Sequence, residues 1–179
     1  MKRCLIVVDY QNDFVSGSLG FPRAAELDTG ISEKIKIYRA NGDDIIFTFD
    51  THEQNYLQTR EGRYLPVEHC IIGTAGHELY GNVHKNRIET DRCFYKITFG
   101  SDELYEYLKT VSYRSIELVG VVSNICVISN AVLAKTAQPE TDIAVDANCV
   151  ASNDDALNTA ALNVMESLQI QVINRKEGE

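Results

Sequence analysis

The chain has 179 residues, of which 44% are hydrophobic and 24% charged, proportions that are ordinary for a soluble globular protein. Its formal net charge of −9, without a clustered basic stripe, argues against a nucleic-acid-binding surface. No apolar run approaches the roughly 18 residues of a membrane span, and the segment before Asp9 is too short for a signal peptide. We therefore expect a cytoplasmic protein that has neither nucleic acid nor membrane as a partner.

Strand and helix patterns alternate along the chain. Short apolar runs predict strands at Arg3–Val8, Asp44–Phe49, Cys93–Lys96, Ser115–Val121, Asp142–Asp146 and Gln169–Ile173. Helical spacing predicts helices at Ile31–Asn41, Asp102–Thr110, Asn124–Ala137 and Asp154–Leu168. Such alternation indicates an α/β fold, a three-layer α/β/α arrangement with a mostly parallel, Rossmann-like central sheet. No linker is visible, so we expect one domain over residues 1–179.

The segment from Thr51 to Glu89 departs from this alternation. It is long, polar and punctuated by glycine, and long loops inside compact domains are usually functional. Within it, His77 and His84 are interpreted as surface residues without a role.

The first predicted strand ends at an acid, Asp9, which directly follows the apolar run Leu5–Val8. We expect Asp9 at the carboxyl edge of the sheet, although a helix cap or a turn is the ordinary alternative. The next loop carries no Gly-x-Gly-x-x-Gly, which disfavours a dinucleotide site, and a phosphate-binding P-loop is absent.

The second long strand ends at Asp50 and runs into His52, and Glu61 and His69 follow in the long segment. A carboxylate and two imidazoles that converge in a loop are typical ligands of a divalent transition metal with open positions. Ordinary loop hydrogen bonds are the alternative interpretation.

A cysteine, Cys126, follows the buried strand Ser115–Val121 at the predicted start of a helix. Ser123 and Asn124 are predicted to cap that helix. The free N–H groups and the dipole at a helix start stabilise a thiolate and lower a cysteine pKa to roughly 3.5–7.5. A buried structural cysteine is the alternative.

Lys96 closes another short apolar stretch, so its ammonium group can lie at the same sheet edge; a snorkelling surface lysine is the usual alternative. Three strands then end in a base, a cation and a nucleophile, namely Asp9, Lys96 and Cys126. An aspartate can take the thiol proton, and a nearby lysine stabilises both carboxylate and thiolate. The five cysteines are widely spaced and form no Cys-x-x-Cys pair, which favours reduced thiols.

Over nearly its whole length the chain resembles the isochorismatase-like cysteine hydrolases, and within them the nicotinamidases. Asp9 in DYQNDF matches the family aspartate, Lys96 the family lysine, and Cys126 in GVVSNICV the family nucleophile. The resemblance implies an amidohydrolase that converts nicotinamide, a small-molecule amide, to nicotinate and ammonia in NAD salvage. Assembly of the chain into a homo-oligomer is compatible with this resemblance.

The resemblance also implies one bound divalent metal ion, zinc first, with iron and manganese as alternatives. Asp50 and His52 match the family's Asp-x-His pair, and His69 in PVEHCIIGTAG matches its later histidine. Some relatives add a glutamate ligand, and Glu61 lies at about that distance, so it is a candidate fourth ligand. In nicotinamidases the metal binds the pyridine nitrogen and orients the ring.

Further implied features concern the oxyanion and the substrate pocket. A cis peptide is expected between Val121 and Val122, and the backbone N–H groups of Val122 and Cys126 are expected to form an oxyanion hole. Phe14 matches a pocket aromatic. Leu65 stands where many relatives have a stacking aromatic, and the neighbouring Tyr64 is a candidate replacement.

Two other functions compete with this interpretation. One is a hydrolase of the same superfamily that acts on another small amide, a ureide or a vinyl ether, since Leu65 puts the substrate in question. The other is a non-catalytic interaction domain of the same fold. The presence of Asp9, Lys96 and Cys126 together counts against the second.

Overall fold

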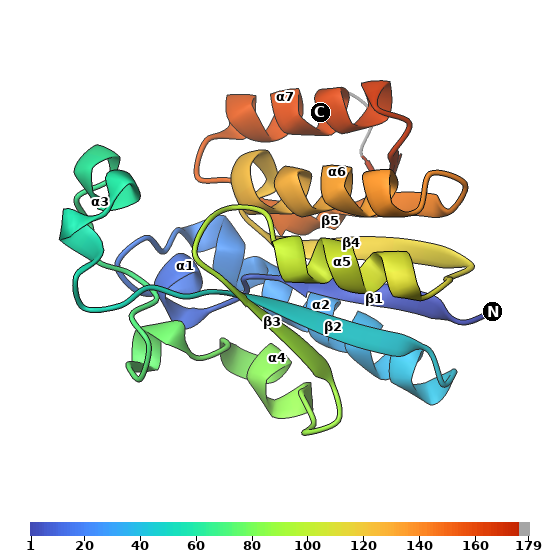
Figure 1. Cartoon of the computed structure of the whole chain (residues 1–179), viewed down its shortest axis with the longest axis horizontal. Helices are drawn as coiled ribbons and strands as arrows, with labels where there is room; N and C mark the ends of the chain where they lie inside the picture. Colours follow the sequence, from blue (N-terminus) through green and yellow to red (C-terminus); the bar gives the residue numbers. More distant parts are fainter. Residues whose placement is uncertain (176–179) are drawn as a thin grey trace.

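The structure is a computed structural model that describes residues 1–175, so the last four residues of the expected 1–179 domain lie outside it. Six parallel strands form one sheet in the order β3-β2-β1-β4-β5-β6 (Figure 1). Their bounds are β1 Arg3–Val8, β2 Asp44–Asp50, β3 Arg92–Lys96, β4 Ser115–Val121, β5 Asp142–Ala151 and β6 Gln171–Ile173. The predicted three-layer fold with a parallel central sheet is confirmed.

Helices cover both faces of this sheet because its strands are apolar on both sides. One core lies under α5 (Asp102–Thr110), α6 (Ile128–Ala137) and α7 (Asp155–Ser167). The second core lies under α1 (Asn12–Val15), α2 (Pro22–Ala40) and α4 (Gly81–Asn86). Strand β1 supplies alternate residues to the two cores, and its residues from Cys4 to Val8 are fully buried. Among residues 1–175, no helix combines the length and the hydrophobicity that crossing a bilayer requires.

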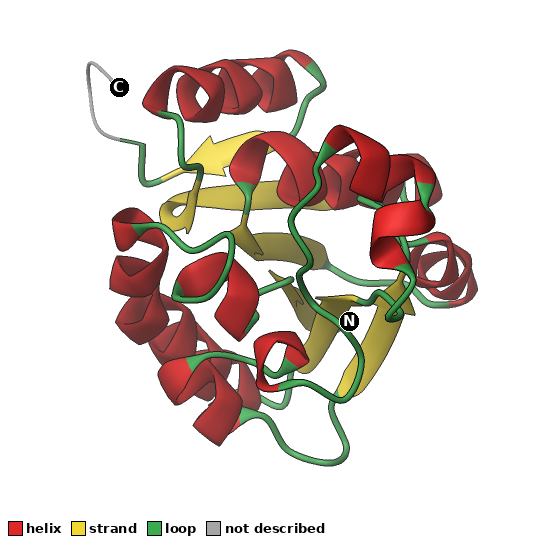
Figure 2. Ribbon diagram, turned by 90° about the vertical axis from the view of Figure 1, so that its left-hand side faces the viewer, coloured by secondary structure: helices red, strands yellow, loops and turns green. Residues whose placement is uncertain are grey.

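The strand order reverses direction at β1, which pairs with β2 on one side and β4 on the other. Ligands of open α/β sheets bind at such a switch point, outside the carboxyl ends of the strands. Figure 2 looks onto this edge, where loops and short helices surround the strand ends. The approach of β1 and β4 requires Gly120, whose φ is +116° and where a side chain would collide with the Val8 carbonyl.

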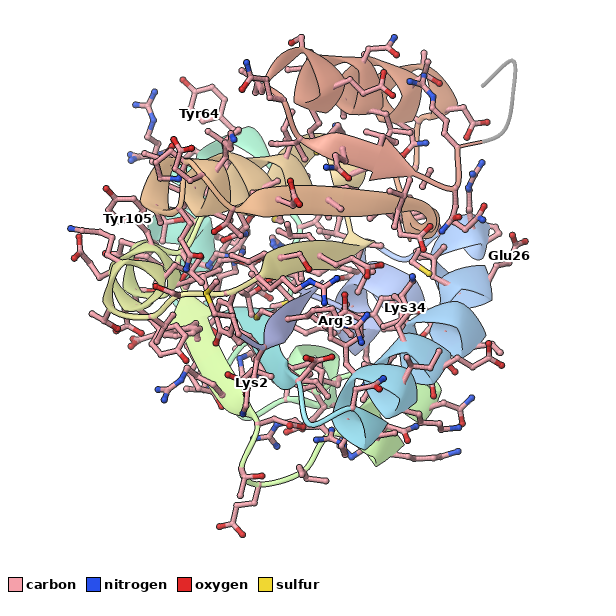
Figure 3. The ribbon with its side chains drawn as sticks, turned by 90° about the vertical axis from the view of Figure 1, so that its right-hand side faces the viewer. Lys2, Arg3, Glu26, Lys34, Tyr64 and Tyr105 are labelled. Atoms are coloured by element: carbon pink, nitrogen blue, oxygen red, sulfur yellow. The ribbon has the colours of Figure 1, made fainter. Side chains whose placement is uncertain are left out.

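Helix α2 is fastened to the sheet by a half-buried ionic cluster. Lys34 Nζ lies 2.7 Å from Glu117 Oε1 on β4 and 2.6 Å from Asp146 Oδ2 on β5. The Tyr38 hydroxyl donates to Glu117 Oε2 at 2.6 Å. Figure 3 shows Lys34 between α2 and the sheet, at the edge of the sheet opposite the carboxyl ends of the strands.

Helix α2 begins at Pro22, nine residues before the predicted start at Ile31, and the prediction was wrong there. Pro22 occupies the first turn, where proline needs no hydrogen-bond partner. Gly30 lies inside the helix because it faces β5, where an added Cβ would lie 3.1 Å from Cys149 Sγ.

Two strand predictions also needed correction. Strand β5 continues to Ala151 rather than ending at Asp146, because a register shift in its pairing with β4 lets it resume alongside Gly120 and Val121. Strand β6 starts at Gln171, since Gln169 has a φ of 63° and turns the chain after α7.

The long segment after β2 is partly helical. It contains α3 (Arg60–Tyr64), α4 and 3₁₀ turns at Tyr56–Gln58 and Ala75–His77. His77 was predicted at the surface but is only 9% exposed. Its ring lies 5.7 Å from that of Phe49 and 6.1 Å from that of Tyr95, and its Nε2 is 2.9 Å from Thr51 Oγ1. His84 is exposed, as predicted.

Candidate active site

Asp9 and Lys96 form a buried ion pair at the carboxyl edge of the sheet. Lys96 Nζ lies 2.6 Å from Asp9 Oδ2, and the two residues are 3% and 0% exposed, so Lys96 is not a snorkelling surface lysine. Asp9 has a φ of 46°, a left-handed conformation that aspartate tolerates better than most residues. Thr48 on β2 donates its hydroxyl to Asp9 Oδ1 at 2.7 Å. Both carboxylate oxygens of Asp9 are therefore held by protein groups.

Each member of this ion pair stabilises the charged form of the other. Burial raises the pKa of Asp9, while the Lys96 ammonium and the Thr48 hydroxyl act in the opposite direction. Burial acts to lower the pKa of Lys96, but Asp9, Cys126 and Asp50 outweigh it and raise that pKa above its ordinary value. Lys96 therefore stays a cation, and Asp9 is a stronger base than an exposed aspartate.

Cys126 completes a cluster with this pair. Its Sγ lies 3.7 Å from Lys96 Nζ, and the residue is 5% exposed. It belongs to a π-helical turn, Ser123–Val127, which joins β4 to α6, and Asn130 Nδ2 donates to its carbonyl at 2.8 Å. Residues from three strand ends thus meet within one cluster, as the chain order of the strands predicted.

The expected helix cap is absent from this turn. Val122 is the N-cap residue, no side chain caps the turn, and the Ser123 hydroxyl instead donates to Asn158 Oδ1 on α7 at 2.6 Å. The prediction of capping by Ser123 and Asn124 was wrong because a π turn places both residues inside the helical segment, beyond the N-cap position. The peptide between Val121 and Val122 is cis, as expected.

The Cys126 pKa also differs from expectation. Burial raises the pKa of the thiol well above its usual value, and the neighbouring Asp9 adds to the rise, while Lys96 acts against it. The resting group is therefore a thiol that needs a base to remove its proton.

Four predicted metal ligands converge beside this cluster. One ligand atom from each of Asp50, His52, Glu61 and His69 lies within 4.8 Å of the others. Asp50 Oδ2 is 3.0 Å from His52 Nε2 and 3.3 Å from His69 Nε2, and Glu61 Oε1 is 3.8 Å from both ring nitrogens. Lys96 Nζ is 3.4 Å from Asp50 Oδ1, so the two clusters share a cation.

The surroundings of these side chains fit a metal site. His69 Nδ1 lies 2.8 Å from the Val67 carbonyl, which fixes the proton on Nδ1 and leaves an Nε2 lone pair aimed at the cluster. Gln11 holds the backbone of Asp50 through both its amide atoms, at 2.8 and 2.9 Å. Burial alone would raise the pKa of Asp50, but the neighbouring imidazole rings of His52 and His69, with the Lys96 charge, hold it well below its usual range.

The two clusters open into one cavity, which we call the inner pocket. Its volume is about 210 Å³, and its walls include Cys126, His69, Glu61, Phe14 and Leu65. The Phe14 ring lies 5.4 Å from the His69 ring. The pocket therefore has a thiol at one point, carboxylate and imidazole ligands at another, and apolar side chains between them.

Two tyrosines that are close to site residues in the sequence lie outside the inner pocket. Tyr64 is 78% exposed on α3 and does not line the inner pocket. Tyr10 is fully buried and donates its hydroxyl to the Ala24 carbonyl at 2.6 Å, so it packs α2 rather than a ligand.

Several site residues were missed from the sequence. Thr48 was detectable in principle, because it lies two residues before Asp50 and so faces the same side of β2. The pocket residues Phe99, Ile125 and Asn153 had no such signal, since loops from three parts of the chain bring them together.

Comparisons with known proteins agree with this geometry. Residues 3–177 match the model of the isochorismatase domain. The chain is 31% identical over 144 residues to an uncharacterized isochorismatase family protein of Bacillus subtilis, covering 74% of this chain and 78% of the relative. It is 28% identical over 190 residues to the nicotinamidase/pyrazinamidase of Mycobacterium tuberculosis, covering 96% and 98%.

Among solved structures, a nicotinamidase/pyrazinamidase from Bacillus subtilis superposes with a TM-score of 0.85 at 29% identity, covering 96% of this chain and 99% of that one. The fold, the extent of the domain match and the identity to these relatives lead to one conclusion: the chain belongs to the isochorismatase family.

Proposed function

We propose that this protein is a cysteine amidohydrolase that converts nicotinamide to nicotinate and ammonia, as one catalytic domain acting in cytoplasmic NAD salvage. The observation that carries the proposal is the inner pocket, into which a Cys126–Asp9–Lys96 cluster and a four-residue metal cluster both open. Relatives 28–29% identical along almost their whole length are nicotinamidase/pyrazinamidase proteins, which supports the same substrate class.

The proposed chemistry begins with proton transfer from the Cys126 thiol to Asp9, and the thiolate then attacks the amide carbon. The backbone N–H groups of Val122 and Cys126 hold the resulting oxyanion; such donors each contribute about 10²–10³ in rate. Asp9 returns the proton to the departing ammonia, which leaves a thioester on Cys126. Asp9 next takes a proton from water, whose oxygen attacks the thioester and expels the Cys126 thiolate. Asp9 gives that proton to the thiolate, and the released nicotinic acid ionises to nicotinate. Lys96 keeps Asp9 ionised and in place.

Asp50, His52 and His69, with Glu61 as fourth ligand, would hold the metal ion. Two imidazoles and two carboxylates are the donors that zinc accepts, and iron and manganese accept them too. When bound, the ion supplies an anchor for the pyridine nitrogen. Phe14 and Leu65 confine the ring between that anchor and Cys126.

A second candidate rests on Leu65. Because an aliphatic side chain lines the inner pocket where many nicotinamidases have a stacking aromatic, the pocket also suits a different small amide or ureide. That substrate would need the same Cys126 chemistry but no ring nitrogen.

The deciding experiment compares kcat/KM for nicotinamide and for benzamide, by ammonia release, with metal analysis of the purified protein. Benzamide lacks the nitrogen that would bind the metal, so we expect nicotinamide to react at least about 100-fold faster. His69→Ala should lose bound metal, whereas the exposed His84→Ala should keep it. Equal rates for the two amides would favour the second candidate, and turnover of neither would contradict both.

A further inference from the structure

A larger cavity adjoins the inner pocket. This outer cavity has a volume of about 700 Å³, and it shares two wall residues, Glu61 and Phe99, with the inner pocket. Its walls come from the segment after β2, from α3 and from the segment between β3 and α5. Figure 1 shows α3 standing out from the carboxyl edge of the sheet, beside that segment.

Three large apolar side chains of the outer cavity are unusually exposed. Tyr64 is 78% exposed, Ile97 80% and Phe99 45%. Single exposed apolar residues need no explanation, but three around one cavity are typical of a surface that binds something. Because the two spaces share Glu61 and Phe99 as wall residues, an occupant of the outer cavity lies beside the ligand of the inner pocket.

The two volumes favour a ligand that extends across both spaces. Binding sites for small molecules usually have volumes of about 300–1,000 Å³. The inner pocket, at about 210 Å³, falls below that range, whereas the outer cavity, at about 700 Å³, lies within it. The metal cluster stands between them, since His52 lines the outer cavity and His69 the inner pocket. A ring anchored at this cluster therefore has the larger space beside it.

The acidic side chains around the outer cavity argue against an anionic occupant. Glu53 and Glu61 line it, and the chain as a whole carries a formal charge of −9, so an anionic group would be repelled. The lining arginine, Arg60, already has an aromatic partner, with its guanidinium carbon 5.4 Å from the centre of the Tyr64 ring.

We propose that the outer cavity is a second subsite, which holds an apolar substituent on the ring of the substrate. The substrate class then includes alkyl-substituted pyridine carboxamides as well as nicotinamide. The inference rests on the proposed function, because the carboxamide of such a substrate must still reach Cys126.

The test uses 5-propylnicotinamide and 6-propylnicotinamide beside nicotinamide, with kcat/KM measured for each. Ile97 is the residue to change, because it lines the outer cavity and not the inner pocket. Losing apolar contacts with a substituent changes kcat/KM by about 10–200-fold. We expect Ile97→Ser to lower kcat/KM for the better propyl substrate by about tenfold and to leave nicotinamide within twofold. Ile37→Ser is the matched control, since Ile37 is 55% exposed on α2 and lines neither space.

Each result distinguishes the subsite from the proposed function. If wild-type protein hydrolyses nicotinamide but neither propyl compound, the subsite is refuted and the proposed function stands. Hydrolysis of a propyl compound without hydrolysis of nicotinamide would uphold the subsite and refute nicotinamide as substrate. A selective loss of less than fivefold in Ile97→Ser would overturn the subsite. If that variant instead has a different mass by light scattering, the apolar surface is a contact between copies of the chain. Turnover of none of the three compounds refutes both proposals.

Discussion

Thr48 provides a sharp test of the proposed role of Asp9, because it can be changed without altering the shape of the core. Its fully buried hydroxyl donates to Asp9 Oδ1 at 2.7 Å, and valine has nearly the same shape without the donor. Hydrogen bonds to charged groups contribute about 1.5–3 kcal/mol. The hydroxyl holds the pKa of Asp9 down, so its loss raises that pKa. At 1.36 kcal/mol per tenfold change, the ionised fraction of Asp9 at acid pH falls by about 10–100-fold.

Only the ionised carboxylate can accept the thiol proton, so the acid limb of kcat/KM should move to higher pH in Thr48→Val. The measurement is ammonia release from nicotinamide between about pH 5 and 9. Thr48→Ser keeps the hydroxyl and should restore the wild-type profile. Thr110→Val removes an exposed hydroxyl on α5, whose partner is the Tyr107 carbonyl, and should change nothing. If Thr48→Val folds normally and its acid limb does not move, Asp9 is not the base.

Three further predictions concern the proton relay and the fold. Cys126→Ala should abolish turnover while circular dichroism stays unchanged, and Cys93→Ala should keep activity; substantial hydrolysis by Cys126→Ala would refute nucleophilic catalysis. Removing Asp9 or Lys96 breaks one relay, so Asp9→Asn/Lys96→Met should lose little more kcat/KM than the worse single variant, and multiplied losses would show that the two act independently. Lys34→Met leaves one buried and one half-buried carboxylate without their cation and should lower the free energy of unfolding by about 1–3 kcal/mol in urea titrations; a change below about 0.5 kcal/mol would show that water or a proton replaces it.

The elements that the sequence predicted well are those in which local pattern and burial agree. Strands Arg3–Val8 and Ser115–Val121 were predicted to the residue, because a β-branched apolar run in a parallel sheet is buried on both faces. The ion pair of Asp9 with Lys96 followed from the parallel order, which brings strand ends to one edge.

The features that were missed depend on contacts distant in the sequence. The buried ring of His77 is packed by Phe49 and Tyr95, which come from two neighbouring strands. The raised pKa of the Cys126 thiol was missed for the same reason, because its desolvation depends on how completely other segments cover it. Helix dipoles can be inferred from sequence position, whereas solvent exclusion cannot.

The central position of β1 has a consequence for biosynthesis. Residues Leu5–Val8 leave the ribosome well before one of their two partners, β4, which begins 110 positions after Leu5 at Ser115. Until then one hydrogen-bonding edge of an entirely apolar strand stays open, and such edges invite pairing with other chains. Nascent chains arrested before Ser115 should therefore depend on a chaperone for solubility, whereas chains released beyond Val121 should not. For this protein, the strand that organises the finished site is also the one most exposed to aggregation while the chain is still growing.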